Sequence, residues 1–225
     1  MNVLVSPQSL ERYAVRILFT LYFCKDFPLS GVVQLQLPFD NNQDIWWIDS
    51  ETKLQKIDFW IRYPDHLAAA LLTGVETDGN LAHRREDVKQ IIRQVFHNQE
   101  PTLRWVPMHK YLHGAYEPLD RVMVYLTSRS LAYRRVEERG HRTKYYLPKK
   151  GQAAVEAMLR ECPETSWYAE RCQLISSYFE HLNGFEIRKL QYLHGSYAET
   201  PYMATIEKVE AEVYNRFEAV FGEPL

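Results

Sequence analysis

Residues 131–159 read LAYRRVEERGHRTKYYLPKKGQAAVEAML, and this stretch decides the fold. Its first two runs, 131–137 and 143–147, are rich in Tyr, Val and Leu and are typical of short strands. The five residues between them include Gly140, whose permissive backbone suits the tip of a hairpin. A helix over 152–159 is predicted to follow, after Pro148, Lys149, Lys150 and Gly151.

Helical patterns precede this hairpin. Residues 85–97 place Val88, Ile92 and Val95 on one face, and Pro118 is expected to open a second helix that runs to about residue 129. Between them, 108–112 is predicted as a helical turn ended by Gly114. The order helix, turn, helix, strand, basic tip, strand, helix predicts a winged helix-turn-helix. We therefore expect a mainly α fold with a small β component.

The predicted winged-helix domain spans 79–162, because the loop at 73–80 contains two Gly and marks a boundary. Residues 1–78 form an N-terminal helical, partner-docking region, for which a degenerate second winged helix stays open. Residues 163–225 form a C-terminal helical region that ends in a long amphipathic helix at 201–221. Helices at 9–25, 51–61, 65–72, 166–182 and 185–193 complete the prediction.

The charge of the chain is uneven. The whole sequence has a formal net charge of −2, which argues against a polyanion-binding protein. Residues 129–150 alone carry +6, so the remainder carries −8. The hairpin is therefore a basic edge on an acidic body.

Nucleic acid is one predicted partner of this edge. In DNA-reading members of the fold, the second helix of the motif enters the major groove and the wing lies against phosphate. The outward face of helix 118–129 offers only two arginines beside Asp120, Val124, Tyr125 and Ser128, which is poor equipment for reading bases. The wing can neutralise phosphates without reading sequence. The candidate nucleic-acid-binding residues are Arg121, Arg129, Arg134, Arg135, Arg139, His141, Arg142 and Lys144. Contact with an acidic protein and simple solvation are the alternatives.

Three segments together carry a resemblance to a known family. Residues 54–67, LQKIDFWIRYPDHL, are similar to a K-[LI]-D-F-[LW]-x-R-Y-P-x-x-L motif, and 109–121, HKYLHGAYEPLDR, look like its downstream R-x-K-[YH]-G-P-[WY]-D-x-R-Y element. With the hairpin, they resemble the small winged-helix accessory subunits of bacterial ABC- or SMC-type ATPase anti-phage systems, of the Lamassu or ABC three-component kind. The chain departs from the family at Ala115, where Pro is expected, and at Ser130, where Gly is expected before the hairpin.

This resemblance implies a non-catalytic subunit that bridges the ATPase and an effector, usually a nuclease. Double-stranded DNA is a further candidate partner, on the evidence of the basic hairpin. The alternative is a stand-alone winged-helix transcription regulator, which needs a sequence-reading helix and a symmetric dimer.

Aromatic residues of the N-terminal half are candidates for partner binding. Phe59 and Tyr63 lie in the DFxxRYP motif, where Asp58 and Arg62 are spaced to pair on a helix and the rings are placed to pack. Trp46 and Trp47 follow a polar turn, and Trp is enriched at interface hot spots. For all four residues, burial in the core is the alternative.

Motifs of catalysis are missing from the sequence. It contains no Gly-rich phosphate loop, GxSxG elbow or HExxH, and His109 and His113 have no third metal ligand at an obvious spacing. We therefore expect no enzyme, no cofactor and no metal. Three cysteines in no metal-ligand spacing indicate a reducing compartment, and neither a signal peptide nor an apolar run of about 20 residues is recognisable. The expected location is the cytoplasm, with no membrane contact.

Overall fold

The computed structural model describes residues 7–26, 45–77, 79–97, 107–112, 114–136 and 143–225. These form a mainly helical protein with small antiparallel sheets. The chain divides into two compact units, each built from separate stretches. Unit 1 comprises 1–58 and 117–185, and unit 2 comprises 59–116 and 186–225.

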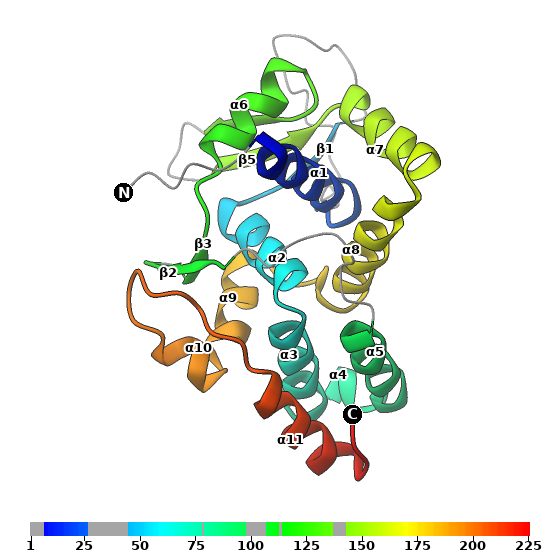
Figure 1. The fold of residues 1–225 in the computed structure, drawn as a ribbon, viewed down its shortest axis with the longest axis vertical. Helices are drawn as coiled ribbons and strands as arrows, with labels where there is room; N and C mark the ends of the chain where they lie inside the picture. Colours follow the sequence, from blue (N-terminus) through cyan, green and yellow to red (C-terminus); the bar gives the residue numbers. More distant parts are fainter. Residues whose placement is uncertain (1–6, 27–44, 78, 98–106, 113, 137–142) are drawn as a thin grey trace. The chain divides into compact units, whose positions relative to one another are not determined.

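The sheet of unit 1 has three strands in the order β1-β5-β4 (Figure 1). The strands are β1 (Trp46–Ile48), β4 (Tyr133–Val136) and β5 (Thr143–Leu147), and both pairings are antiparallel. The hairpin was expected from its turn residues. The third strand comes from about 100 residues upstream and pairs Trp47 with Tyr146.

Helix α1 (Pro7–Phe23) lies at the centre of unit 1. It packs against β1 and β5 of the sheet and against three other helices, α6 (Asp120–Ser128), α7 (Lys149–Glu161) and α8 (Ser166–Phe179). Its apolar stripe is almost inaccessible to solvent, since Ile17 and Leu21 have 0% exposure. Helix α2 (Glu51–Arg62) begins in this unit, and a 3-10 turn (Pro163–Thr165) precedes α8.

Two backbone devices fix the hairpin between α6 and α7. Ser130 adopts a left-handed conformation (φ 58°) directly after α6, and the next amide, that of Leu131, donates to the Leu126 carbonyl at 2.9 Å, as in a Schellman cap. At the start of α7, a Cβ on Gly151 would lie 2.1 Å from the Leu131 carbonyl oxygen. Sterics therefore explain why Gly follows Lys150 after the hairpin, because a residue with a Cβ would clash with the Leu131 carbonyl.

Buried polar contacts join α1, α2 and the segment before α6. The guanidinium of Arg16 forms an ion pair with Asp58 and lies 3.8 Å from a Glu117 carboxylate oxygen. Burial opposes the charge on Arg16, but the two carboxylates prevail and raise its pKa above the ordinary value. The Gln55 amide accepts from the Glu117 backbone N–H at 3.1 Å and donates to its carbonyl at 2.6 Å. Asp58 and Glu117 are the residues at which unit 1 is interrupted.

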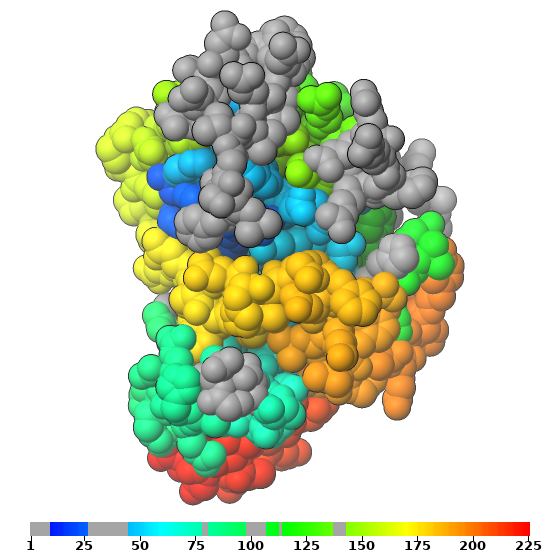
Figure 2. Space-filling view, turned by 180° about the vertical axis from the view of Figure 1, so that it is seen from behind, coloured from blue at the N-terminus to red at the C-terminus, as the bar shows by residue number. Residues whose placement is uncertain are grey.

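Unit 2 is built around α3 (Pro64–Thr77), which has ten buried residues, among them Ala68, Ala69 and Ala70. Small side chains let neighbouring helices approach, and α4 (Gly79–Ala82), α5 (Arg85–His97) and α11 (Glu210–Phe221) pack on it. Figure 2 shows α5 and α11 as adjoining surfaces, which Arg85 joins through a hydrogen bond to the Val220 carbonyl. The unit also contains the hairpin β2 (His109–Tyr111) and β3 (Gly114–Tyr116), most of α9 (Gly184–Tyr192), and α10 (Gly195–Glu199).

Three predictions of secondary structure are wrong. Residues 108–112 form no helical turn, because β2 pairs with β3 and Gly114, at φ 96°, turns the chain back. The loop expected at 73–80 is largely helical, since α3 continues through Gly74 to Thr77. The last helix begins at Glu210 instead of 201. The compact units also divide the chain differently from the three predicted consecutive regions, and place 85–97 in unit 2.

Candidate nucleic-acid interface

Helix α6 presents the outward face expected of it. Val122, Met123 and Leu126 are buried, while Arg121 and Val124 are exposed, the latter to 67%. Arg129 does not project from this face. Its guanidinium lies 3.7 Å from the centroid of the Tyr125 ring and donates to the Tyr125 carbonyl at 3.2 Å. One of the two arginines of the face is therefore held against its own helix.

A shallow hollow adjoins the exposed side of α6. Its lining residues are Leu10 of α1 and Asp120, Arg121, Val124 and Tyr125 of α6. An exposed valine beside an apolar hollow suits contact with another apolar side chain better than contact with base edges, which require hydrogen-bonding groups. Within the described residues, this face therefore combines apolar surface with one arginine, Arg121, that forms no ion pair.

The hairpin holds two cations that are partly neutralised. Arg134 of β4 pairs with Asp120 of α6 at 2.7 Å, and the hydrogen bond to this carboxylate raises the pKa of Arg134. Lys144 of β5 lies 3.2 Å from an Asp49 carboxylate oxygen. Both contacts are exposed to solvent, so each contributes only about 0–1 kcal/mol to stability. These acidic partners lie 14 and 95 residues away in the sequence, and no spacing rule reveals them.

Arg135 is the hairpin cation without an acidic partner in the part of the chain that the structure describes. The register places it directly opposite Lys144, and it is exposed. Like charges at opposed positions of an antiparallel pair destabilise the sheet. An anion at this position would remove the repulsion. The wing candidates Arg139, His141 and Arg142 lie outside the described residues.

The four aromatic candidates fall into two groups. Phe59 and Tyr63 have 0% exposure and stack on each other at 4.5 Å between ring centroids, so they belong to the core of unit 2, which is the alternative given for them above. Trp46 and Trp47 lie in β1 and are half-buried. The Trp46 ring contacts Tyr22 at 4.8 Å and lies beneath the Lys25 ammonium group.

A polar cluster in unit 2 escaped the sequence reasoning. His66 and His194 are buried 5.6 Å apart, measured between ring centroids, although 128 residues separate them in the sequence. His66 lies at a position that the 54–67 motif leaves open, and no motif connects it with His194. Within the described ranges, no group of three His, Cys, Asp or Glu side chains could hold a metal ion.

Cys24 and Cys172 are buried as free thiols, and burial raises the pKa of Cys172 well above the ordinary value.

Comparison with known proteins yields no family model, no curated protein and no solved structure that matches the chain. Among the described helices, none is both long enough and apolar enough to cross a membrane.

Proposed function

We propose that the chain is a non-catalytic accessory subunit that links an SMC- or ABC-type ATPase to an effector, most simply a nuclease. In this proposal unit 1 is a winged helix whose β4–β5 hairpin contacts duplex DNA without reading its sequence. We infer the ATPase and the effector as partners because residues 54–67 and 109–121 resemble the accessory subunits of anti-phage systems.

The strand order β1-β5-β4 is the main support for the winged helix. In that fold the first strand pairs with the last, and the last two strands form the wing. The chain order α1, β1, α2, α6, β4, β5 then matches three helices and three strands, with α6 as the recognition helix. Residues 63–116 of unit 2 would be an insertion in the turn between α2 and α6, where the fold usually has a short connection.

The Arg135–Lys144 pairing supports contact with phosphate. It brings two cations together on the hairpin, and only one of them has an acidic neighbour among the described residues. The adjoining tip sequence adds Arg139, His141 and Arg142. Phosphate contacts of this kind supply affinity without sequence information.

The face of α6 argues against the rival, a transcription regulator. Arg129 is held on Tyr125, Asp120 neutralises Arg134, and Val124 occupies the middle of the face. Specific readers need several bidentate contacts, each worth about 1–3 kcal/mol of discrimination. The same apolar face suits a protein partner.

Binding to unrelated duplexes tests the DNA part of the proposal. Fluorescence anisotropy with three duplexes of different sequence, at one salt concentration, should give equal affinities within about threefold. A dimer of the chain that prefers one operator by about a thousandfold, as specific binders do, would contradict the proposal and establish the regulator.

Co-expression tests the adaptor part. The chain should co-purify with an SMC- or ABC-type ATPase encoded beside its gene, and Val124→Asp should weaken this complex. Failure of the ATPase to co-purify with the unmodified chain would contradict the adaptor.

A further inference from the structure

Residues 203–209 of unit 2, which we call the strap, connect α10 to α11 and are held by hydrogen bonds on both sides. On one side, the Met203 N–H donates to the Lys110 carbonyl at 2.7 Å, and the Ile206 N–H donates to the Met108 carbonyl at 3.0 Å. On the other side, the first turn of α3 and the residue before it supply side chains. The strap is therefore fixed by backbone hydrogen bonds on one side and by the side chains of a few residues on the other, and losing one of these side chains removes a backbone partner.

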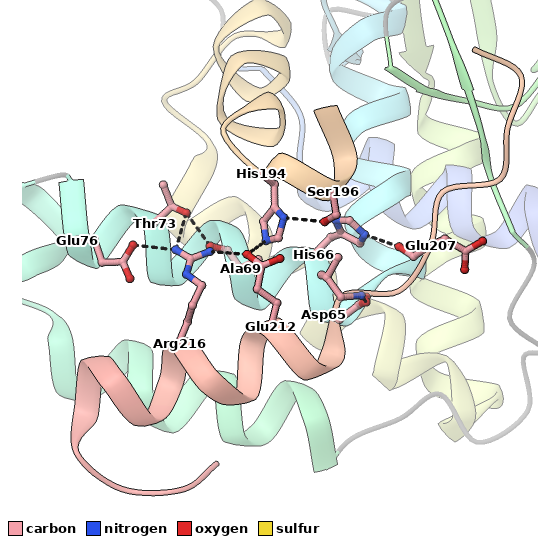
Figure 3. Close-up of polar contacts among 11 residues, drawn as sticks. Asp65, His66, Ala69, Thr73, Glu76, His194, Ser196, Glu207, Glu212 and Arg216 are labelled. Carbon is pink, nitrogen blue, oxygen red and sulfur yellow. Dashed lines mark hydrogen bonds and ion pairs between the residues drawn. The ribbon is translucent and has the colours of Figure 1, made fainter. Parts of the chain in front are cut away.

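The side chain of Tyr63 and two side chains of the first turn of α3 form hydrogen bonds with the backbone of the strap. The Tyr63 hydroxyl donates to the Ile206 carbonyl at 3.3 Å, and a carboxylate oxygen of Asp65 accepts from the Val209 N–H at 2.5 Å. His66 lies between them and contacts the Glu207 carbonyl through Nε2 at 2.9 Å (Figure 3). Because a carbonyl only accepts, Nε2 of His66 carries the proton, and the neutral ring has none on Nδ1.

A second buried imidazole faces His66. His194 ends the link between α9 and α10, its Nδ1 lies 3.3 Å from the Ser196 hydroxyl, and its Nε2 lies 3.4 Å from a carboxylate oxygen of Glu212 on α11 (Figure 3). Arg216, one turn along α11, reaches Thr73 at 3.0 Å and Glu76 at 2.8 Å on α3. The two histidines thus stand where the strap, α3 and α11 meet.

The charged and titratable groups around the pair act in both directions. Asp65 and Glu212 favour an imidazolium ion, whereas Arg216 and the neighbouring imidazole oppose one on His194. Tyr63, Tyr197 and Phe59 pack around the His66 ring, which also contacts the His194 ring. Burial is the largest cause, and it lowers the pKa of both histidines below the ordinary value.

We propose that His66 and His194 form an acid-sensitive clasp, which holds the strap and α11 on α3 near neutral pH and releases them on acidification. Two buried, adjacent imidazoles accept protons more readily when the strap has lifted and water reaches them. This device is independent of the proposed DNA contact.

The direction of the pH effect follows from linkage. A histidine whose pKa is lower when the clasp is closed contributes its full stabilisation above the open-state pKa, about 6.5, and loses it as the pH falls from there toward the closed-state pKa. In that window, each histidine raises the opening equilibrium by up to about tenfold per pH unit.

Limited trypsin digestion of the full chain measures this release. Cleavage after Lys208, in the strap, is compared with cleavage after Arg129, which lies outside unit 2. The ratio of the two rates, followed by mass spectrometry from about pH 7.5 to about pH 5, cancels the pH dependence of trypsin itself. We expect the ratio to rise as the pH falls below about 6.5.

The matched variant is His66→Gln with His194→Gln, which keeps amide donors but cannot take up a proton. It should give a ratio that is constant over this range. A flat ratio in the unmodified chain, an equal rise in the double variant, or a rise that begins only near pH 4, where carboxylates titrate, would each overturn the clasp. If the double variant fails to fold, Glu212→Gln replaces it. Loss of this carboxylate should lower the pKa of His194 further and steepen the rise, and an unchanged rise would count against the clasp.

Discussion

The two units stabilise their interiors with different kinds of polar group. Unit 1 contains buried ion pairs, namely Arg16 with Asp58 and Lys53 with Asp26. Unit 2 contains two adjacent buried imidazoles, those of His66 and His194, beside the buried carboxylate of Asp65. Breaking a buried ion pair costs several kcal/mol, and mild acid does not disrupt it. A neutral imidazole is easier to bury than a charge, but it can take up a proton in mild acid. Unit 1 is thus suited to a fixed surface, and unit 2 to one that responds to its surroundings.

The largest effect is expected from Asp58→Ala in unit 1. The change leaves the Arg16 guanidinium buried with only the more distant Glu117 carboxylate, at 3.8 Å, and breaking such buried pairs costs about 3–5 kcal/mol. Urea unfolding followed by circular dichroism measures the loss. The control is Glu210→Ala, which removes the exposed ion pair with Lys208 and should cost less than about 1 kcal/mol. Equal losses in the two variants would remove the distinction between the buried and the exposed pair.

Gly151→Ala should be the next most damaging change. The new Cβ would lie 2.1 Å from the Leu131 carbonyl and 2.6 Å from Cδ1 of Leu147, so α7 or the hairpin must move at a cost of about 1–3 kcal/mol. Gly195→Ala in unit 2 is the matched control, because nothing lies within 4 Å of its Cβ position. Thermal denaturation should show a lower Tm for the first variant alone, and an unchanged Tm there would mean that the close approach is not real.

Tyr197→Phe should weaken unit 2 without adding a charge. The Tyr197 hydroxyl accepts a hydrogen bond from the buried Ala115 N–H at 2.7 Å, and burial raises the pKa of this phenol. An orphaned buried donor costs about 1–3 kcal/mol. Because the group is neutral in the folded protein, urea unfolding should give the same loss at about pH 6 and about pH 8. A loss confined to one of these values would contradict the assignment.

Ser130→Gly should give the smallest change, and a favourable one. Ser130 has a positive φ, where Gly carries no Cβ penalty, and this is the position at which the resembled family has Gly. We expect stabilisation of about 0.5–1 kcal/mol, since part of the relief is lost to the greater freedom of the unfolded chain. Met203→Gly, at φ 65° in unit 2, tests the same effect. Destabilisation in both variants would show that these conformations carry no strain.

The sequence predicted much of the local structure. Periodic apolar residues placed α5 and α6 correctly, and the hairpin strands followed from their turn. The strand β1 was missed because it is only three residues long and its partner lies about 100 residues away. The strap was mistaken for helix, because Ile206 and Val209 recur at helical spacing while its backbone bonds go to Tyr63, Asp65 and Met108 instead.

The candidate site was predicted by residue type and only partly by geometry. Arg134, Arg135 and Lys144 lie on the two hairpin strands as expected, but the acidic neighbours Asp120 and Asp49 come from other parts of the chain. Phe59 and Tyr63 lie in the packed core, which is the alternative that the sequence left open for them. The pairing of His66 with His194 depends on tertiary contacts alone, and local patterns do not encode it.

A salt titration of binding to a random duplex tests the central claim, that the hairpin of unit 1 contacts phosphate. The variant Arg135→Ala/Arg139→Ala/Arg142→Ala is compared with one that removes three cations of unit 2, Arg84→Ala/Lys189→Ala/Lys208→Ala. We predict that the slope of log affinity against log salt becomes shallower by about 0.9 for each phosphate that the first variant no longer neutralises, and stays unchanged in the second. An unchanged slope in the first variant, or equal changes in both, would contradict the claim.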